Sequence, residues 1–269
     1  MRYSRSIPAA LLLSAVWHGA LAQETIPYAG GEFTITEEDD ATKVLAFDGK
    51  ELARDYFVFF NGLHEIAGSE VALFEVGEGG NACGADTLIV WNAPERGIEA
   101  VQATDDCNAP SAAISAYAIY FVPYLLPGET QPVRYWSPDA GLKLAGNMAF
   151  SPQPGTRWSD VSPPGHMMDV FENEAVYEAS RALLGSDLTE VVRGLSVGGE
   201  PNSLGEGQFW SRGCVPHACG VSDSFMAVDA KAGKVYFAQQ QDGGGPKAWP
   251  DAATWPKPLR DAMAGAIGR

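Results

Sequence analysis

Residues 208–238, QFWSRGCVPHACGVSDSFMAVDAKAGKVYFA, contain three predicted strands and, between the first two, a pair of cysteines five positions apart. The strands at 208–212, 225–228 and 235–238 are rich in the aromatic and β-branched residues that favour extended backbone. A turn at 231–233 joins the last two strands into a hairpin. This stretch therefore predicts a strand, a cysteine loop and a hairpin in one antiparallel sheet.

The cysteine loop is the sharpest feature of the chain. It consists of Cys214, Val215, Pro216, His217, Ala218, Cys219 and Gly220. Pro216 fixes its own φ angle and restricts Val215, and a disulfide between the two cysteines would close the loop. We expect a stiff loop that presents the imidazole of His217 near its apex. The alternative is a disulfide-pinned connection in which this histidine is exposed without a function.

Helical periodicity precedes the loop. Asp169 is predicted to cap a helix over 169–184, and Gly185 is placed to end it. Residues 187–190 resemble a capping box that opens a second, short helix with an apolar face. The inward residues of that helix are Leu188, Val191, Val192 and Leu195. With a terminal helix from Pro258, the second half of the chain is predicted to be an α+β domain, an antiparallel sheet with flanking helices.

The first half shows strand signals separated by turn residues. The predicted strands are 33–36, 43–47, 56–60, 70–76, 86–91, 98–103 and 116–122. We therefore expect two domains, an N-terminal all-β module of unknown role and the C-terminal α+β domain. The boundaries are expected at 23–149 for the β module, 150–165 for a Pro/Gly-rich linker and 166–269 for the α+β domain.

The first 22 residues have the features of a secretory signal. Arg2 and Arg5 form a basic start, residues 7–17 form a short apolar run, and residues 20–22, Ala-Leu-Ala, form a small-x-small cleavage site. We expect cleavage after Ala22 and a periplasmic product. No later stretch approaches 18 uninterrupted apolar residues, so no stable membrane anchor is expected.

Four cysteines in an exported chain predict two disulfides. Their spacing favours the pairs Cys83–Cys107 and Cys214–Cys219, and the other two pairings remain open. In the oxidising compartment a disulfide is favoured over two alternatives. These are a metal site with ligands Cys214, His217 and Cys219, and a cysteine nucleophile activated by His217.

The charge balance argues against nucleic acid as a partner. The chain has 34 acidic and 18 basic residues, for a net charge of −16, whereas nucleic-acid binders need a clustered basic surface. Most of the excess lies before residue 150, where 20 acids oppose 6 bases after the signal. Such a charge would steer the protein toward a strongly basic partner, although acidic exported proteins are also common.

The loop and its surroundings resemble the bacterial inhibitor of vertebrate lysozyme family, whose signature is Cys-x-Pro-His-x-Cys-Gly after a helix and strand and before a hairpin. Residues 214–220 fit this signature, and the resemblance covers the chain from about residue 165. It implies that the loop enters the cleft of a lysozyme or another muramidase, from the host or endogenous, and that His217 meets the catalytic carboxylates. It implies no catalysis, cofactor or metal. Val215 and Ala218 depart from the charged residues often found in family loops.

Other candidate residues have ordinary structural explanations. The acidic runs 37–40 and 105–106 could bind calcium but lack the spacing of a calcium loop, and are predicted to be solvated. His64 and His166 are predicted to be surface or loop residues. Four tryptophans could form a sugar-stacking platform but are more simply explained as core. They are Trp158, Trp210, Trp249 and Trp255. The alternatives to an inhibitor are a non-inhibitory envelope interaction or peptidoglycan-binding module and, third, a cell-wall enzyme.

Overall fold

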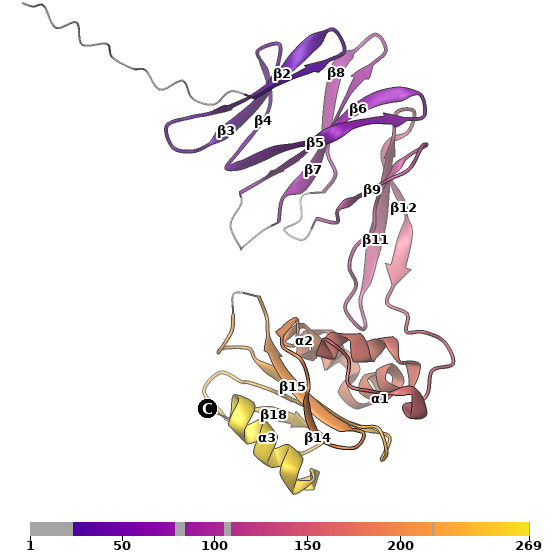
Figure 1. Ribbon diagram of the computed structural model, residues 1–269, viewed down its shortest axis with the longest axis vertical. Helices are drawn as coiled ribbons and strands as arrows, with labels where there is room; N and C mark the ends of the chain where they lie inside the picture. Colours follow the sequence, from indigo (N-terminus) through magenta and orange to yellow (C-terminus); the bar gives the residue numbers. More distant parts are fainter. Residues whose placement is uncertain (1–23, 79–83, 105–108, 217, 269) are drawn as a thin grey trace, which may run out of the picture.

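The computed structural model describes residues 24–78, 84–104, 109–216 and 218–268. Its first half is all β and its second half combines an antiparallel sheet with helices, as predicted (Figure 1). Strands of the first half are β1 (Glu24–Tyr28), β2 (Gly31–Glu37), β3 (Lys43–Phe47), β4 (Lys50–Asp55), β5 (Phe57–Ile66), β6 (Ser69–Gly77), β7 (Asp86–Ala93), β8 (Gly97–Gln102), β9 (Ala112–Ile114), β10 (Ile119–Phe121), β11 (Thr130–Ser137) and β12 (Gly141–Ala149). They form the sheets β1–β4, β5–β8 and β9–β12.

The sheet β5–β8 is the middle layer of this half. Its side chains alternate between two separate clusters, because neighbouring residues of a strand point to opposite faces. One cluster contains Phe33 and Leu45 of the sheet β1–β4 with Ala72, Phe74 and Val90 of the middle sheet. The other contains Ile119, Phe121 and Trp136 of the sheet β9–β12 with Val71, Leu73 and Ile89. Burial of both faces explains why the centres of β6 and β7, residues 71–74 and 88–91, are continuously apolar.

The second half contains one sheet between two layers of helix. Its strands are β13 (Val197–Gly198), β14 (Asn202–Gly205), β15 (Gln208–Cys214), β16 (Ser224–Asp229), β17 (Lys234–Gln239) and β18 (Lys247–Trp249), in the order β13-β15-β16-β17-β18 with β14 beside β15. The helices are α1 (Glu174–Leu184), α2 (Leu188–Arg193) and α3 (Lys257–Ile267), and the 3-10 turns are η1 (Trp158–Asp160), η2 (Met167–Glu172), η3 (Gly185–Asp187) and η4 (Ala252–Thr254). Alternate residues of β16 contact α1 and α2 on one face and α3 on the other. Figure 1 shows α1 and α2 on one side of the sheet and α3 on the other. The predicted hairpin is β16–β17.

The predicted start of the first helix is wrong. Asp169 lies in η2, and α1 begins after Asn173, whose side-chain oxygen accepts a hydrogen bond from the Val176 amide at 3.2 Å. The backbone of Asn173 is extended, which separates the 3-10 turn from the α-helix. Gly185 ends α1 as predicted. Asp187 makes no side-chain cap on α2 and pairs instead with Lys247 at 2.8 Å.

The four predicted inward residues of the second helical segment are all buried. Leu188, Val191, Val192 and Leu195 belong to the cluster under α1 and α2. Among the described residues, no helix combines the length and apolarity that a bilayer crossing requires.

The two halves contact each other through the connection 122–129 between β10 and β11. Leu126 joins the cluster under α1 and α2. The Thr189 hydroxyl on α2 donates a hydrogen bond to the Pro127 carbonyl at 3.1 Å, and Arg193 pairs with Glu129 at 3.0 Å. A Cβ on Gly128 would lie 2.8 Å from the Thr189 hydroxyl oxygen, so glycine permits this close approach. The β module is therefore docked on α2, close to the segment that supports the cysteine loop.

Candidate functional site

A disulfide closes the loop that follows β15. Cys214 and Cys219 are bonded, with their Cα atoms 4.9 Å apart. This confirms the predicted pair. In this bonded state neither sulfur is the free thiolate that a metal ligand or a nucleophile requires. The predicted partners Cys83 and Cys107 lie outside the described residues, and so does His217.

The first end of the loop is fixed by strand pairing. Val197 of β13 is paired with Cys214, and its carbonyl oxygen lies 3.8 Å from the Cys214 sulfur. Gly213 passes directly beside Leu195, where a Cβ would lie 2.7 Å from the Leu195 Cα and carbonyl oxygen. The loop therefore leaves the sheet from a tightly packed backbone.

The second part of the loop is wound into local turns. The Ala218 amide donates to the Val215 carbonyl at 3.0 Å, and the Ala218 carbonyl accepts from the amides of Val221 and Ser222 at 3.2 and 3.3 Å. Gly220 has a φ of +88°, which non-glycine residues rarely adopt. The exposed residues of this loop include Pro216, Cys219 and Gly220, while Val215 and Ala218 are half-buried.

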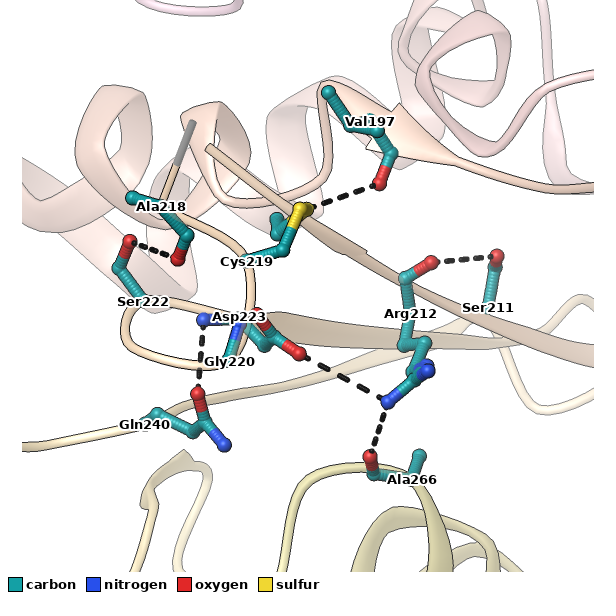
Figure 2. A network of polar contacts seen from close by, with 11 residues as sticks. Val197, Ser211, Arg212, Ala218, Cys219, Gly220, Ser222, Asp223, Gln240 and Ala266 are labelled. Carbon is teal, nitrogen blue, oxygen red and sulfur yellow. Dashed lines mark hydrogen bonds and ion pairs between the residues drawn. A yellow bond between two sulfur atoms is a disulfide. The ribbon is translucent and has the colours of Figure 1, made fainter. Parts of the chain in front are cut away.

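Asp223, which was not among the residues predicted from the sequence, anchors this second end. Its Oδ1 accepts a hydrogen bond from the Gly220 amide at 2.6 Å, and its Oδ2 lies 3.8 Å from a guanidinium nitrogen of Arg212 (Figure 2). The Asp223 amide donates to the Gln240 side chain at 3.2 Å, and the Gln240 amide donates to the Asp223 carbonyl at 2.9 Å. Asp side chains can accept local hydrogen bonds from a backbone amide three residues earlier, but the spacing of Gly220 and Asp223 alone does not indicate this contact.

Arg212 extends the anchor to α3. The same guanidinium nitrogen donates to the Ala266 carbonyl at 3.0 Å, near the end of that helix. A pocket of about 920 Å³ lies beside the disulfide, between β13–β15 and α3. Its polar or charged lining includes Glu200, Asn202, Arg212, Asp223, Gln240 and Asp261. The loop, its anchor and this pocket form one continuous surface.

The four tryptophans are packed as core and do not form one platform. Trp158 and Trp249 pack against the cluster under α1 and α2, whereas Trp210 and Trp255 belong to the opposite, α3 face. The indole nitrogen of Trp255 donates to the Pro250 carbonyl at 2.7 Å, which satisfies its polar atom within the protein. The core explanation is confirmed.

The remaining candidates serve local structure. Asp40 accepts a hydrogen bond from the Thr42 amide at 3.0 Å, which lowers the pKa of this carboxyl, and Glu38 pairs with Arg54. His166 accepts from the Met168 amide at 3.2 Å and caps η2. The run 105–106 lies outside the described residues. In the part of the chain that the structure describes, no three His, Cys, Asp or Glu side chains are grouped for metal binding.

A disulfide-closed loop between β15 and the hairpin β16–β17, preceded by α1 and α2, is the arrangement expected from the family resemblance. Residues 175–269 match the family Inhibitor of vertebrate lysozyme (Ivy). The resemblance predicted from the loop is thereby confirmed, and this part of the chain is the Ivy region below. Residues 29–149 match a second family, the Y4bG N-terminal domain.

One relative extends across both regions. The chain is 23% identical over 223 residues to the uncharacterized protein y4bG of Sinorhizobium fredii (strain NBRC 101917 / NGR234), covering 82% of each chain. Among solved structures, a subtype N11 neuraminidase-like protein of A/flat-faced bat/Peru/033/2010 is 8% identical with a TM-score of 0.23, covering 84% of this chain and 69% of that chain. So low a score carries no information about this fold.

Proposed function

We propose that this protein is an exported inhibitor of lysozyme-type muramidases. The Ivy match supports lysozyme-inhibitor function in general. The observation that carries the proposal is the disulfide-closed loop, which is anchored at both ends and has exposed residues between its anchors. An inhibitor of this kind occludes a cleft without catalysis and without a cofactor. Its partner is a lysozyme or another muramidase, from the host or endogenous.

In the proposed mechanism the loop enters the enzyme's cleft and His217 meets the catalytic carboxylates. Retaining glycosidases hold two carboxyl groups about 5 Å apart, and an imidazole can donate hydrogen bonds across that gap. Pro216 and the disulfide reduce the conformational entropy that the loop loses on binding. The half-buried apolar residues Val215 and Ala218 leave this central contact to His217.

The first experiment measures inhibition constants of residues 23–269 against several muramidases. We expect His217→Ala to weaken inhibition by about 2 to 4 kcal/mol, because it leaves desolvated carboxylates without their partner. The melting temperature should change little. His166→Asn is the matched control, since it retains an acceptor for the Met168 amide and lies outside the loop. If His217→Ala inhibits as strongly as the parent, the proposed mechanism is wrong.

The proposal includes export to the periplasm after cleavage behind Ala22. Mass spectrometry of periplasmic protein should find an N-terminus at Gln23. We further propose the division into a β module at 23–149, a linker at 150–165 and an α+β domain at 166–269.

The alternative is a peptidoglycan-binding module that keeps the loop for stability alone. Exposed aromatic rings in the β module favour it, since Tyr117 and Tyr124 are each 79% exposed and such rings can stack on sugars. Sedimentation with insoluble peptidoglycan tests it. If the parent inhibits no muramidase and sediments with peptidoglycan, this alternative replaces the inhibitor.

A further inference from the structure

Asp223 is a nearly buried carboxylate directly behind the disulfide loop. The residue is 7% exposed. Burying a carboxylate is unfavourable unless hydrogen bonds and an opposite charge compensate for the lost water. Here the compensation comes from the Gly220 amide at 2.6 Å and the Arg212 guanidinium at 3.8 Å. The carboxylate is thus held by the loop on one side and by β15 on the other.

The contact with Gly220 fixes the part of the loop that the sheet does not reach. Cys214 ends β15, but the residues after it leave the ladder, and the chain rejoins the sheet at Ser224. Between these points Gly220 has a positive φ angle, and its amide donates a hydrogen bond to Asp223. Arg212 links the same carboxylate to the Ala266 carbonyl of α3.

We infer that Asp223 is the positioning residue of the inhibitory loop, fixing the Cys219–Gly220 end so that the loop is presented in one conformation. This inference rests on the proposed function for its inhibition readout. Asp223 makes no contact with the partner in this scheme; it acts through the Gly220 amide. A hydrogen bond to a charged group is among the stronger ones in proteins, so its removal should loosen this end markedly.

The test compares Asp223→Ala with Asp223→Asn in the full chain. Asparagine keeps an oxygen acceptor for the Gly220 amide, so it should rescue the loop, whereas alanine removes the acceptor. We expect Asp223→Ala to raise the inhibition constant roughly tenfold and to accelerate hydrogen exchange of the Gly220 amide at least about tenfold. Asp223→Asn should change both measurements less than Asp223→Ala does, because it keeps the acceptor for the Gly220 amide while losing the charge that faces Arg212.

Asp229 provides a matched control at the other end of β16. It is also 7% exposed, and its carboxylate accepts from the Ala232 amide at 2.9 Å in the β16–β17 turn. Asp229→Ala should lower the melting temperature about as much as Asp223→Ala does. It should leave the inhibition constant and the hydrogen exchange of the Gly220 amide unchanged. If Asp229→Ala weakens inhibition as much as Asp223→Ala, the effect is general destabilisation and the inference is overturned.

The outcomes separate this inference from the proposed function. A parent protein that inhibits no muramidase contradicts the proposed function, while Gly220 exchange still tests the anchor. A parent that inhibits, with Asp223→Ala unchanged in inhibition and exchange, overturns the inference alone. If Asp223→Ala does not unfold cooperatively, Asp223→Ser is measured in its place, and the same outcomes support or overturn the inference.

Discussion

Gly213 shows how the absence of a side chain at one residue permits the close packing at the start of the loop. It has the backbone of Leu195 as its neighbour, and backbone cannot move aside as the end of a flexible side chain can. The need for glycine follows from the backbone at Leu195, just before β13, passing directly beside β15, so periodicity along the sequence could not reveal it. The same holds for Asp223, whose partners Arg212 and Gln240 are remote in sequence.

Gly213→Ala should lower the free energy of unfolding by about 1 to 3 kcal/mol, because the new methyl group overpacks against Leu195. Inhibition should weaken as well, since β15 positions Cys214. Gly199→Ala is the control, because a Cβ at Gly199 has no atom within 4 Å among the described residues. Urea unfolding of both variants checks this, and equal losses would contradict the packing explanation.

Asp86 gives a pH-dependent prediction in the β module. It is buried, which raises the pKa of its carboxyl, although the amides of Thr87 and Thr104 each donate to it at 2.7 Å. A raised folded-state pKa means that the folded protein binds this proton more tightly than the unfolded chain, whose Asp pKa is about 3.9. The parent should therefore gain unfolding free energy relative to Asp86→Asn as the pH falls from 7 toward 4. Denaturant unfolding of both proteins at several pH values measures this difference, and a constant or falling difference would contradict the prediction.

At the scale of elements, apolar patterning predicted the buried strands and missed the polar ones. β6 and β7 are recognisable because both of their faces are covered. β4 is the polar edge of its sheet, and β11 contains Pro132, a residue that sheet interiors usually exclude. Pro132 is paired with Asn147 of β12, whereas the pairing of β10 covers residues 134–136 of β11. Pro132 therefore has a neighbouring strand on one side only, as at the edge of a sheet, where proline is tolerated.

The docked connection 122–129 gives a prediction for an element. Gly128→Ala should detach this connection from α2, because the methyl group would meet Thr189 at 2.8 Å and Leu188 at 3.2 Å. We expect a loss of about 1 to 3 kcal/mol of unfolding free energy and faster proteolysis within 122–129. Gly141→Ala controls for backbone strain, since Gly141 also has a positive φ but open space around its Cβ position. If Gly141→Ala is equally damaging, backbone strain alone explains the loss.

In the whole molecule, the two halves are joined by packing contacts as well as by the linker. The core of the Ivy region is contacted by Leu126 of the connection 122–129 and by two residues of the segment 150–165, Phe150 and Trp158. No sequence pattern marks these contacts, because each involves residues far apart in the chain. The two halves were predictable as fold classes, but their docking was not.

A fragment of residues 165–269 should fold cooperatively and yet be less stable than the same region in the full chain. Loss of Leu126, Phe150 and Trp158 should cost about 2 to 4 kcal/mol, judged from the apolar surface that becomes exposed. A fragment of residues 150–269 should be more stable than the 165–269 fragment and less stable than the Ivy region in the full chain. Denaturant unfolding, monitored through the amide signals of the Ivy region, checks this order. Equal stability of the two fragments and the full chain would show that the contacts contribute nothing.

The two-sided burial of the sheet β5–β8 has a consequence for self-association. The segments 71–74, Val-Ala-Leu-Phe, and 88–91, Leu-Ile-Val-Trp, are uncharged and strongly β-forming, which is the composition of segments that pair with copies of themselves. In the native protein they are covered by β1–β4 on one side and β9–β12 on the other. If the middle sheet forms before the outer sheets pack on it, the chain exposes two apolar faces to other chains. The outer sheets therefore protect the middle sheet from aggregation. Mutations that delay the packing of the outer sheets should reduce the yield of native protein more than they reduce its final stability.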